Sequence, residues 1–186
     1  MESSLGKNEL MKIINDLDRN MYGNGYYVTL VGSSPLIYEG SVSSRLTNDI
    51  DYIDTNIPNL NGTYGVMNNR AMTYIDSLPY NYEDRLRLVS ELDNISIYAP
   101  SYEDHVVMKL IRYWSHDVIE ITELVEKDLV DIEMLADLVY DFDESASAIL
   151  ADDTFRRLLD NFEDMFPRYA DSARREEVWR RRTNRF

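Results

Sequence analysis

Residues 26–40 read YYVTLVGSSPLIYEG, and three structural signals follow one another within them. Five of the first six residues are β-branched or aromatic, a run that predicts a buried strand. Gly32 follows at once. Ser34 is then expected to be the N-cap of a short helix whose first residue is a proline, and Gly40 stands where that helix would end. A strand, a glycine turn and a helix in direct succession indicate an α/β unit.

The Gly32-Ser33 turn is suited to bind an anion. Glycine lets the backbone pass close to a phosphate group, and the helix that follows presents N–H groups and a positive dipole end. Ser33 and Ser34 add hydroxyl donors. A glycine between a strand and a helix is also the ordinary residue of a tight turn, so this segment alone leaves both interpretations open.

Residues 45–54 read RLTNDIDYID and predict a second strand from Asp49 to Asp54. Alternation along a strand points Asp49 and Asp51 to the same face, a few ångströms apart. Two carboxylates so placed repel each other, and a cation between them removes the repulsion. Magnesium held by one or two carboxylates and by substrate phosphates is usual in phosphoryl-transfer sites. The alternative is the exposed polar face of an edge strand.

The remaining patterns predict an α/β unit over residues 1–100 and a helical half over residues 101–186, with a boundary near Pro100. Apolar residues recur with helical spacing between residues 7 and 20. The other expected elements are a loop over 56–70, a short helix over 71–78, a short strand over 95–98 and a capped helix that starts at 101–104, with further helices after it.

Composition restricts the chemistry. The 186 residues include no cysteine and two histidines, so a disulfide framework, a cysteine zinc site and a histidine-rich metal site are excluded. A metal would be hard and oxygen-liganded, which favours Mg²⁺ or Mn²⁺. No apolar run approaches the roughly 20 residues that span a bilayer, and the N-terminus lacks a signal-peptide pattern. We therefore expect a cytoplasmic protein without a membrane segment.

The net charge of −15 is unevenly distributed. Residues 117–153 hold 13 acids and one lysine, whereas residues 168–186 hold seven arginines and three acids. An acidic body repels nucleic acid, so RNA would have to bind at the arginine-rich tail. The alternative is that this tail folds back onto the acidic helices or docks on a partner protein.

Residues 32–40 and 45–51 together resemble the bacterial DUF6036 and AbiEii/MenT-like nucleotidyltransferases. Those proteins carry a Gly-Gly/Ser turn, a short helix that ends in glycine and an Arg-x-Thr-x-Asp-Ile-Asp strand. Residues 98–110 resemble the family's strand and proline-capped helix with a Lys-Leu pair. Residues 117–120 resemble its Arg-Asp-x-x-Asp motif. The resemblance implies a nucleotidyltransferase-like α/β (α+β) fold, with a small mixed sheet flanked by helices and a C-terminal helical half.

The resemblance also implies roles for single residues. Gly32 and Ser33, with Ser34 beside them, would bind the nucleotide phosphates. Asp49 and Asp51 would be catalytic and would bind the metal.

Two further residues receive roles downstream. Lys109 would bind phosphate and Asp117 would be a further catalytic acid. A helical wheel supports the first role, because it places Lys109 opposite an apolar stripe and therefore outside the core; the stripe is Val107, Leu110, Ile111 and Trp114. Asp117 has a second interpretation, as an acid in the first turn of a helix capped by Ser115.

The chain departs from the family pattern at several positions. Gly32-Ser33 replaces the commoner Gly-Gly, His116 stands where arginine or lysine is frequent, and Glu120 replaces an aspartate. A third metal-binding carboxylate has no clear counterpart, and Asp93 is the nearest residue.

The function implied by the resemblance is metal-dependent transfer of a nucleoside monophosphate from a nucleoside triphosphate to tRNA or protein. The setting would be a toxin–antitoxin or phage-defence pair, with an antitoxin as partner. The incomplete carboxylate set favours a second hypothesis, a catalytically degenerate module that binds nucleotide or protein. The acidic surface suits a cationic acceptor and leaves a third, a small-molecule nucleotidyltransferase of the antibiotic-modifying type.

Overall fold

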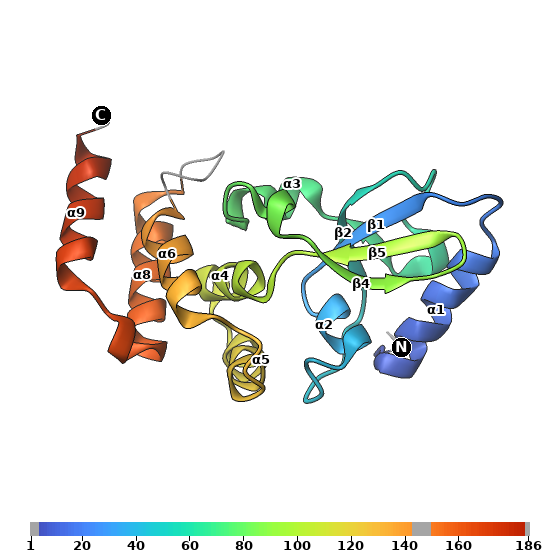
Figure 1. Cartoon of the computed structure of the whole chain (residues 1–186), viewed down its shortest axis with the longest axis horizontal. Coiled ribbons are helices and arrows are strands. Elements are labelled where there is room, and N and C mark those ends of the chain that lie inside the picture. The colour runs from blue at the N-terminus through green and yellow to red at the C-terminus, as the bar shows by residue number, and fades with distance from the viewer. Residues whose placement is uncertain (1–3, 143–149, 185–186) are drawn as a thin grey trace. The chain divides into compact units, whose positions relative to one another are not determined.

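The computed structural model describes residues 4–142 and 150–184 (Figure 1). The chain divides into two compact units. The first consists of residues 1–74 and 83–101, and the second of residues 75–82 and 102–186.

The first unit is built on a five-stranded sheet in the order β3-β2-β1-β5-β4. The strands are β1 (Tyr26–Val31), β2 (Ile50–Thr55), β3 (Met67–Asn69), β4 (Arg87–Glu91) and β5 (Ile95–Ala99). β1 runs parallel to β5 and antiparallel to β2, while β3 is parallel to β2 and β4 antiparallel to β5. The predicted small mixed sheet is therefore confirmed.

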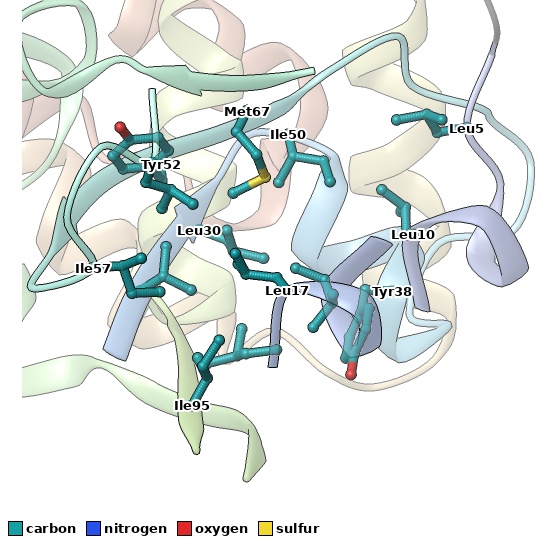
Figure 2. Packing of buried hydrophobic residues seen from close by; sticks show 14 of the residues in the cluster. Leu5, Leu10, Leu17, Leu30, Tyr38, Ile50, Tyr52, Ile57, Met67 and Ile95 are labelled. Carbon is teal, nitrogen blue, oxygen red and sulfur yellow. The ribbon is translucent and has the colours of Figure 1, made fainter. Parts of the chain in front are cut away.

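One face of this sheet is covered by α1 (Lys7–Arg19), close to the helix predicted over residues 7–20. Leu10 and Leu17 of α1 pack with alternate strand residues, such as Leu30 and Ile50 (Figure 2). Because side chains alternate along a strand, Asp51 lies on the opposite face of the sheet. The core thus fixes the face on which the two predicted metal ligands lie.

The glycine turn is followed by α2 (Ser34–Glu39). Gly40 ends this helix in the left-handed conformation, as predicted. The predicted N-cap was wrong by one residue, because Ser33 is the N-cap and the Ser34 hydroxyl instead donates a hydrogen bond to the carbonyl of Val31. The hydroxyl of Ser34 therefore donates to the last carbonyl of β1 and does not accept from the amides at the start of α2.

The prediction of a loop over residues 56–70 was wrong in part. This segment contains the 3₁₀ turn η1 (Thr63–Gly65) and strand β3, which pairs with the edge of β2. Its three residues include two asparagines, which disfavour strands, so the pairing rather than the propensity determines the structure. Strand β4 was not predicted either.

The chain between β3 and β4 forms short helical turns. They are α3 (Ala71–Tyr74), η2 (Ile75–Ser77) and η3 (Tyr82–Arg85), of which the first two cover most of the short helix predicted over 71–78.

The second unit is helical, as predicted for the C-terminal half. Its elements are α4 (Tyr102–Arg112), α5 (Ser115–Glu126), α6 (Ile132–Tyr140), α8 (Asp152–Met165), η4 (Pro167–Tyr169) and α9 (Ser172–Thr183). α4 packs against α5, α6 and α8, so residues 103–110 are all buried. The helical-wheel argument that placed Lys109 outside the core was therefore wrong, since a helix surrounded by others has no outer face.

The arginine-rich tail folds back onto acidic helices, which was one of the two alternatives. Arg174 pairs with acids of α6 and the adjoining turn, Arg175 with acids of α8, and Arg182 with Asp152 and the carbonyl of Leu150. These three guanidinium groups are engaged within the chain. Among residues 4–142 and 150–184, each helix is too short or too polar to cross a lipid bilayer.

Candidate functional site

The turn between β1 and α2 brings Gly32 against Asp51. Gly32 has a φ of +72°, and a Cβ added there would lie 3.6 Å from both the Asp51 Oδ2 and the Tyr74 hydroxyl. The backbone angle favours glycine, because L-residues rarely adopt it. The turn backbone therefore approaches a carboxylate of β2 directly, as the register that opposes Val31 and Asp51 dictates.

The predicted serines of this turn have different surroundings. Ser34 is buried and its hydroxyl hydrogen is used within the turn, as described above. The Ser33 hydroxyl accepts a hydrogen bond of 3.4 Å from the Arg45 guanidinium. α2 has only six residues, so its dipole adds little. The anion-binding potential of the turn therefore rests on Gly32, Ser33 and Arg45.

Asp49 and Asp51 lie beside each other, as shown by the guanidinium of Arg70, which contacts both carboxylates. Arg70 Nε is 3.1 Å from Asp51 Oδ1, and its Nη2 is 3.7 Å from Asp49 Oδ2. The Asp49 side chain is 36% exposed and that of Asp51 is 13% exposed. The pair is thus open on one side.

Three residues of the segment 68–74 hold this pair, and sequence reasoning missed them. Besides Arg70, the Asn68 amide donates to Asp49 Oδ2 at 3.2 Å, and the Tyr74 hydroxyl donates to Asp51 Oδ2 at 3.2 Å. Recognition of β3 could have found them, since its parallel register places Asn68 opposite Asp51.

The local electrostatics favour a cation. Burial and the neighbouring charge of Asp49 raise the pKa of Asp51, although hydrogen bonds from Arg70 and Tyr74 oppose the rise. The hydrogen bond to Asp51 in turn raises the pKa of Arg70. Negative charge is therefore costly at Asp51, and a cation beside both carboxylates lowers that cost.

The donor set fits a hard divalent ion that also takes ligands from a substrate. The described residues contain no cluster of three or more His, Cys, Asp or Glu side chains able to hold a metal. Asp93 does not join the pair, because it precedes β5, whose start lies beside the start of β1 and not beside Gly32. Two carboxylates, completed by phosphate oxygens and water, remain a suitable Mg²⁺ set.

The second unit gathers the other predicted residues into a buried ion cluster. Lys109 Nζ lies 2.5 Å from Glu120 Oε2 and 3.8 Å from Asp117 Oδ1. Asp117 accepts two hydrogen bonds from Arg112, of 2.9 and 2.5 Å. The side chains of Lys109, Asp117 and Glu120 are at most 3% exposed. The positive charges of Lys109 and Arg112 compensate the negative charges of Asp117 and Glu120 inside the helical unit.

The cluster also explains the start of α5. Asp117 accepts a hydrogen bond from the backbone N–H of Trp114, which is the N-cap, so the prediction of Ser115 as the cap was wrong. Burial alone would raise the pKa of Asp117, but the Arg112 hydrogen bonds and the charge of Lys109 outweigh it and lower that pKa. Burial lowers the pKa of Lys109, against the opposing effect of Glu120 and Asp117.

Replacing Gly32 by alanine tests the turn. The added Cβ meets ordinary contacts, so the cost comes from the positive φ and should be about 1–2 kcal/mol of unfolding free energy, measured in urea. Gly62→Ala is a matched control, because Gly62 has a φ of +78° with nothing within 4 Å. Both variants should lose similar stability, but only Gly32→Ala should weaken triphosphate binding. Equal binding by the two variants would remove the turn from the site.

Comparison with known families identifies the family of the chain. A family model described as "Nucleotidyltransferase of unknown function (DUF6036)" matches residues 8–170. No curated protein and no solved structure matches the chain. Since the match covers most of the sequence and includes both the Gly32 turn and the Asp49–Asp51 pair, the chain belongs to the DUF6036 family of nucleotidyltransferases.

Proposed function

We propose that this protein transfers a nucleoside monophosphate from a nucleoside triphosphate to an acceptor hydroxyl, with Mg²⁺ or Mn²⁺ held by Asp49 and Asp51. The observation that carries the proposal is the close approach of the Gly32 turn to Asp51, whose Oδ2 lies 3.6 Å from a Cβ built on the glycine. A phosphate bound at this turn would lie beside the carboxylates that would hold the metal ion.

The residues of the first unit divide the work. Gly32 lets the turn backbone approach the phosphates, while Ser33 and Arg45 place a hydroxyl and a positive charge beside it. The metal, when bound, supplies positive charge against the α-phosphate and makes the acceptor hydroxyl more acidic. The acceptor oxygen bonds to the α-phosphorus, the bond to the β-phosphate oxygen breaks, and pyrophosphate and the hydroxyl proton leave.

The roles of Lys109 and Asp117 stay predictions. The described contacts of both residues lie within the buried cluster of the helical unit. We assign them a structural role first, and phosphate binding by Lys109 would require it to leave Glu120.

For the acceptor we propose tRNA or protein, in a toxin–antitoxin or phage-defence pair with an antitoxin partner; this rests on the resemblance to AbiEii/MenT-like proteins. The ion pairs of α9 argue against its arginines as the main RNA contact.

One observation favours a second function, a catalytically degenerate module that binds nucleotide. The described residues offer two carboxylates at the site and no third, and both already have hydrogen-bond donors from the protein. Such a site could still hold a triphosphate, so binding does not separate the two functions. Product formation does.

The test is transfer of label from each of the four α-labelled ribonucleoside triphosphates, with Mg²⁺ or Mn²⁺, into bacterial RNA and protein. Label in one fraction establishes the enzyme and identifies both the nucleotide and the acceptor class. Label on neither fraction, together with transfer to aminoglycosides, would indicate the small-molecule type. Folded protein that binds triphosphate and labels no acceptor would support the degenerate module.

A further inference from the structure

The Arg70 guanidinium occupies the position at which a cation would neutralise the two carboxylates. It contacts Asp51 at 3.1 Å and Asp49 at 3.7 Å, and its side chain is 42% exposed. One positive charge thus already contacts both negative charges of the pair.

The backbone of Arg70 is fixed, so this contact belongs to the fold. Its N–H donates to the carbonyl of Tyr52 at 2.8 Å, which extends the pairing of β3 with β2 by one residue. Its carbonyl accepts from the N–H groups of Thr73 and Tyr74, at 2.8 and 3.0 Å, and so starts α3. Because both the N–H and the carbonyl of Arg70 are hydrogen-bonded, the position of its Cα and Cβ is fixed by the fold.

Three of the four carboxylate oxygens accept a hydrogen bond from a nearby side chain. Arg70 and Tyr74 donate to the two oxygens of Asp51, and Asn68 donates to Oδ2 of Asp49. The hydroxyl of Thr47 lies 3.5 Å from the remaining oxygen and is closer, at 3.1 Å, to the backbone carbonyl of Asp49. A divalent cation that arrives alone must share these oxygens with a guanidinium of the same sign, which weakens its binding.

A triphosphate changes this balance. It brings several negative charges to the site, and the planar fork of a guanidinium matches phosphate oxygens as well as it matches carboxylates. Arg70 can then exchange its carboxylate partners for phosphate, which leaves the carboxylate oxygens to the metal.

We propose that Arg70 is a positioning residue that opposes the binding of free divalent cations and admits the metal together with the triphosphate. This inference rests on the proposed function of the Asp49–Asp51 pair. It predicts that one substitution changes two affinities in opposite directions. Removal of the guanidinium strengthens binding of the metal alone and weakens binding of the metal–triphosphate complex. A purely structural arginine would weaken both.

The experiment measures Mn²⁺ binding by electron paramagnetic resonance, without and with a non-hydrolysable α,β-methylene triphosphate. For Arg70→Gln we expect free Mn²⁺ to bind about tenfold more tightly and the Mn²⁺–triphosphate complex about tenfold more weakly than in the wild type. Arg19→Gln is the matched control, since it removes the same charge from the same unit at a side chain that is 77% exposed. It should change neither affinity by more than about twofold.

Arg70→Lys separates the effect of the positive charge from that of the guanidinium shape. It also replaces Arg70→Gln as the test if the glutamine variant does not fold. The lysine keeps the positive charge, so free Mn²⁺ should bind as weakly as in the wild type, while loss of the fork should weaken the triphosphate complex. If Arg70→Gln shifts both affinities in the same direction, or neither, the inference is overturned and the proposed function stands. If neither the wild type nor Arg70→Gln binds Mn²⁺ under any condition, the proposed metal site itself fails.

Discussion

Asp51→Asn is expected to lower nucleotidyl transfer by about two to three orders of magnitude while the protein remains folded. Asparagine has the shape of aspartate and retains an oxygen that can accept the hydrogen bond from Arg70. The charge that would hold the metal is lost, and Arg70 keeps Asp49 as a partner. The rate of label transfer at saturating triphosphate measures the effect, and circular dichroism with thermal unfolding measures the fold.

Asp54→Asn is the control for this prediction. Asp54 lies on the same strand, is exposed, and is paired by hydrogen bonding and charge with Tyr27, whose pKa it raises, instead of with the site. This variant should transfer label at nearly the wild-type rate. Equal losses in the two variants would mean that general acidity of the strand matters, and full activity of Asp51→Asn would remove Asp51 from the catalytic site.

Local signals predicted the centre of the first unit. A β-branched strand, a glycine and a short helix stand in direct succession, and each signal needs only neighbouring residues. The alternation of Asp49 and Asp51 then placed both carboxylates on one face. What failed was the segment that surrounds them, because residues 68–74 take their positions from the pairing of β3 with β2 rather than from their own propensity.

The helical unit shows a different failure of sequence reasoning. Periodicity located α4, but it divided the helix into an apolar face and a polar face, and so placed Lys109 outside the core. In the structure the residues beside it, including Asp104 and His105, are buried as well. Buried Lys109 is compensated by Asp117 and Glu120 of another helix, α5, and a pattern along α4 alone contains no information about those partners.

Replacing Lys109 by methionine is expected to lower the free energy of unfolding by about 3–5 kcal/mol, as measured in urea. Methionine has a similar length and no charge, so the packing is nearly kept while the buried carboxylate of Glu120 loses the ammonium group 2.5 Å away. Lys109→Met combined with Glu120→Gln should recover much of the loss, because the second change removes the buried charge that the first leaves uncompensated.

Lys127→Met is the matched control, at a lysine that is 40% exposed and 3.9 Å from Glu123. It should lower the free energy of unfolding by less than about 1 kcal/mol.

Acid unfolding gives an independent reading of the same cluster. The pKa of Asp117 is lowered in the folded protein, so its ionised form stabilises the fold above its unfolded pKa, and this contribution is lost as the pH falls through the lowered value. Lys109 is one cause of that lowering, and its removal should bring the pKa of Asp117 up. Lys109→Met should therefore unfold in acid at a higher pH than the wild type, as measured by tryptophan fluorescence, whereas Lys127→Met should not.

An unchanged acid midpoint of Lys109→Met with a large loss of stability in urea would assign the cost of the substitution to packing and not to charge. A small loss in both experiments would show that Lys109 can leave Glu120 cheaply, as a phosphate-binding lysine must.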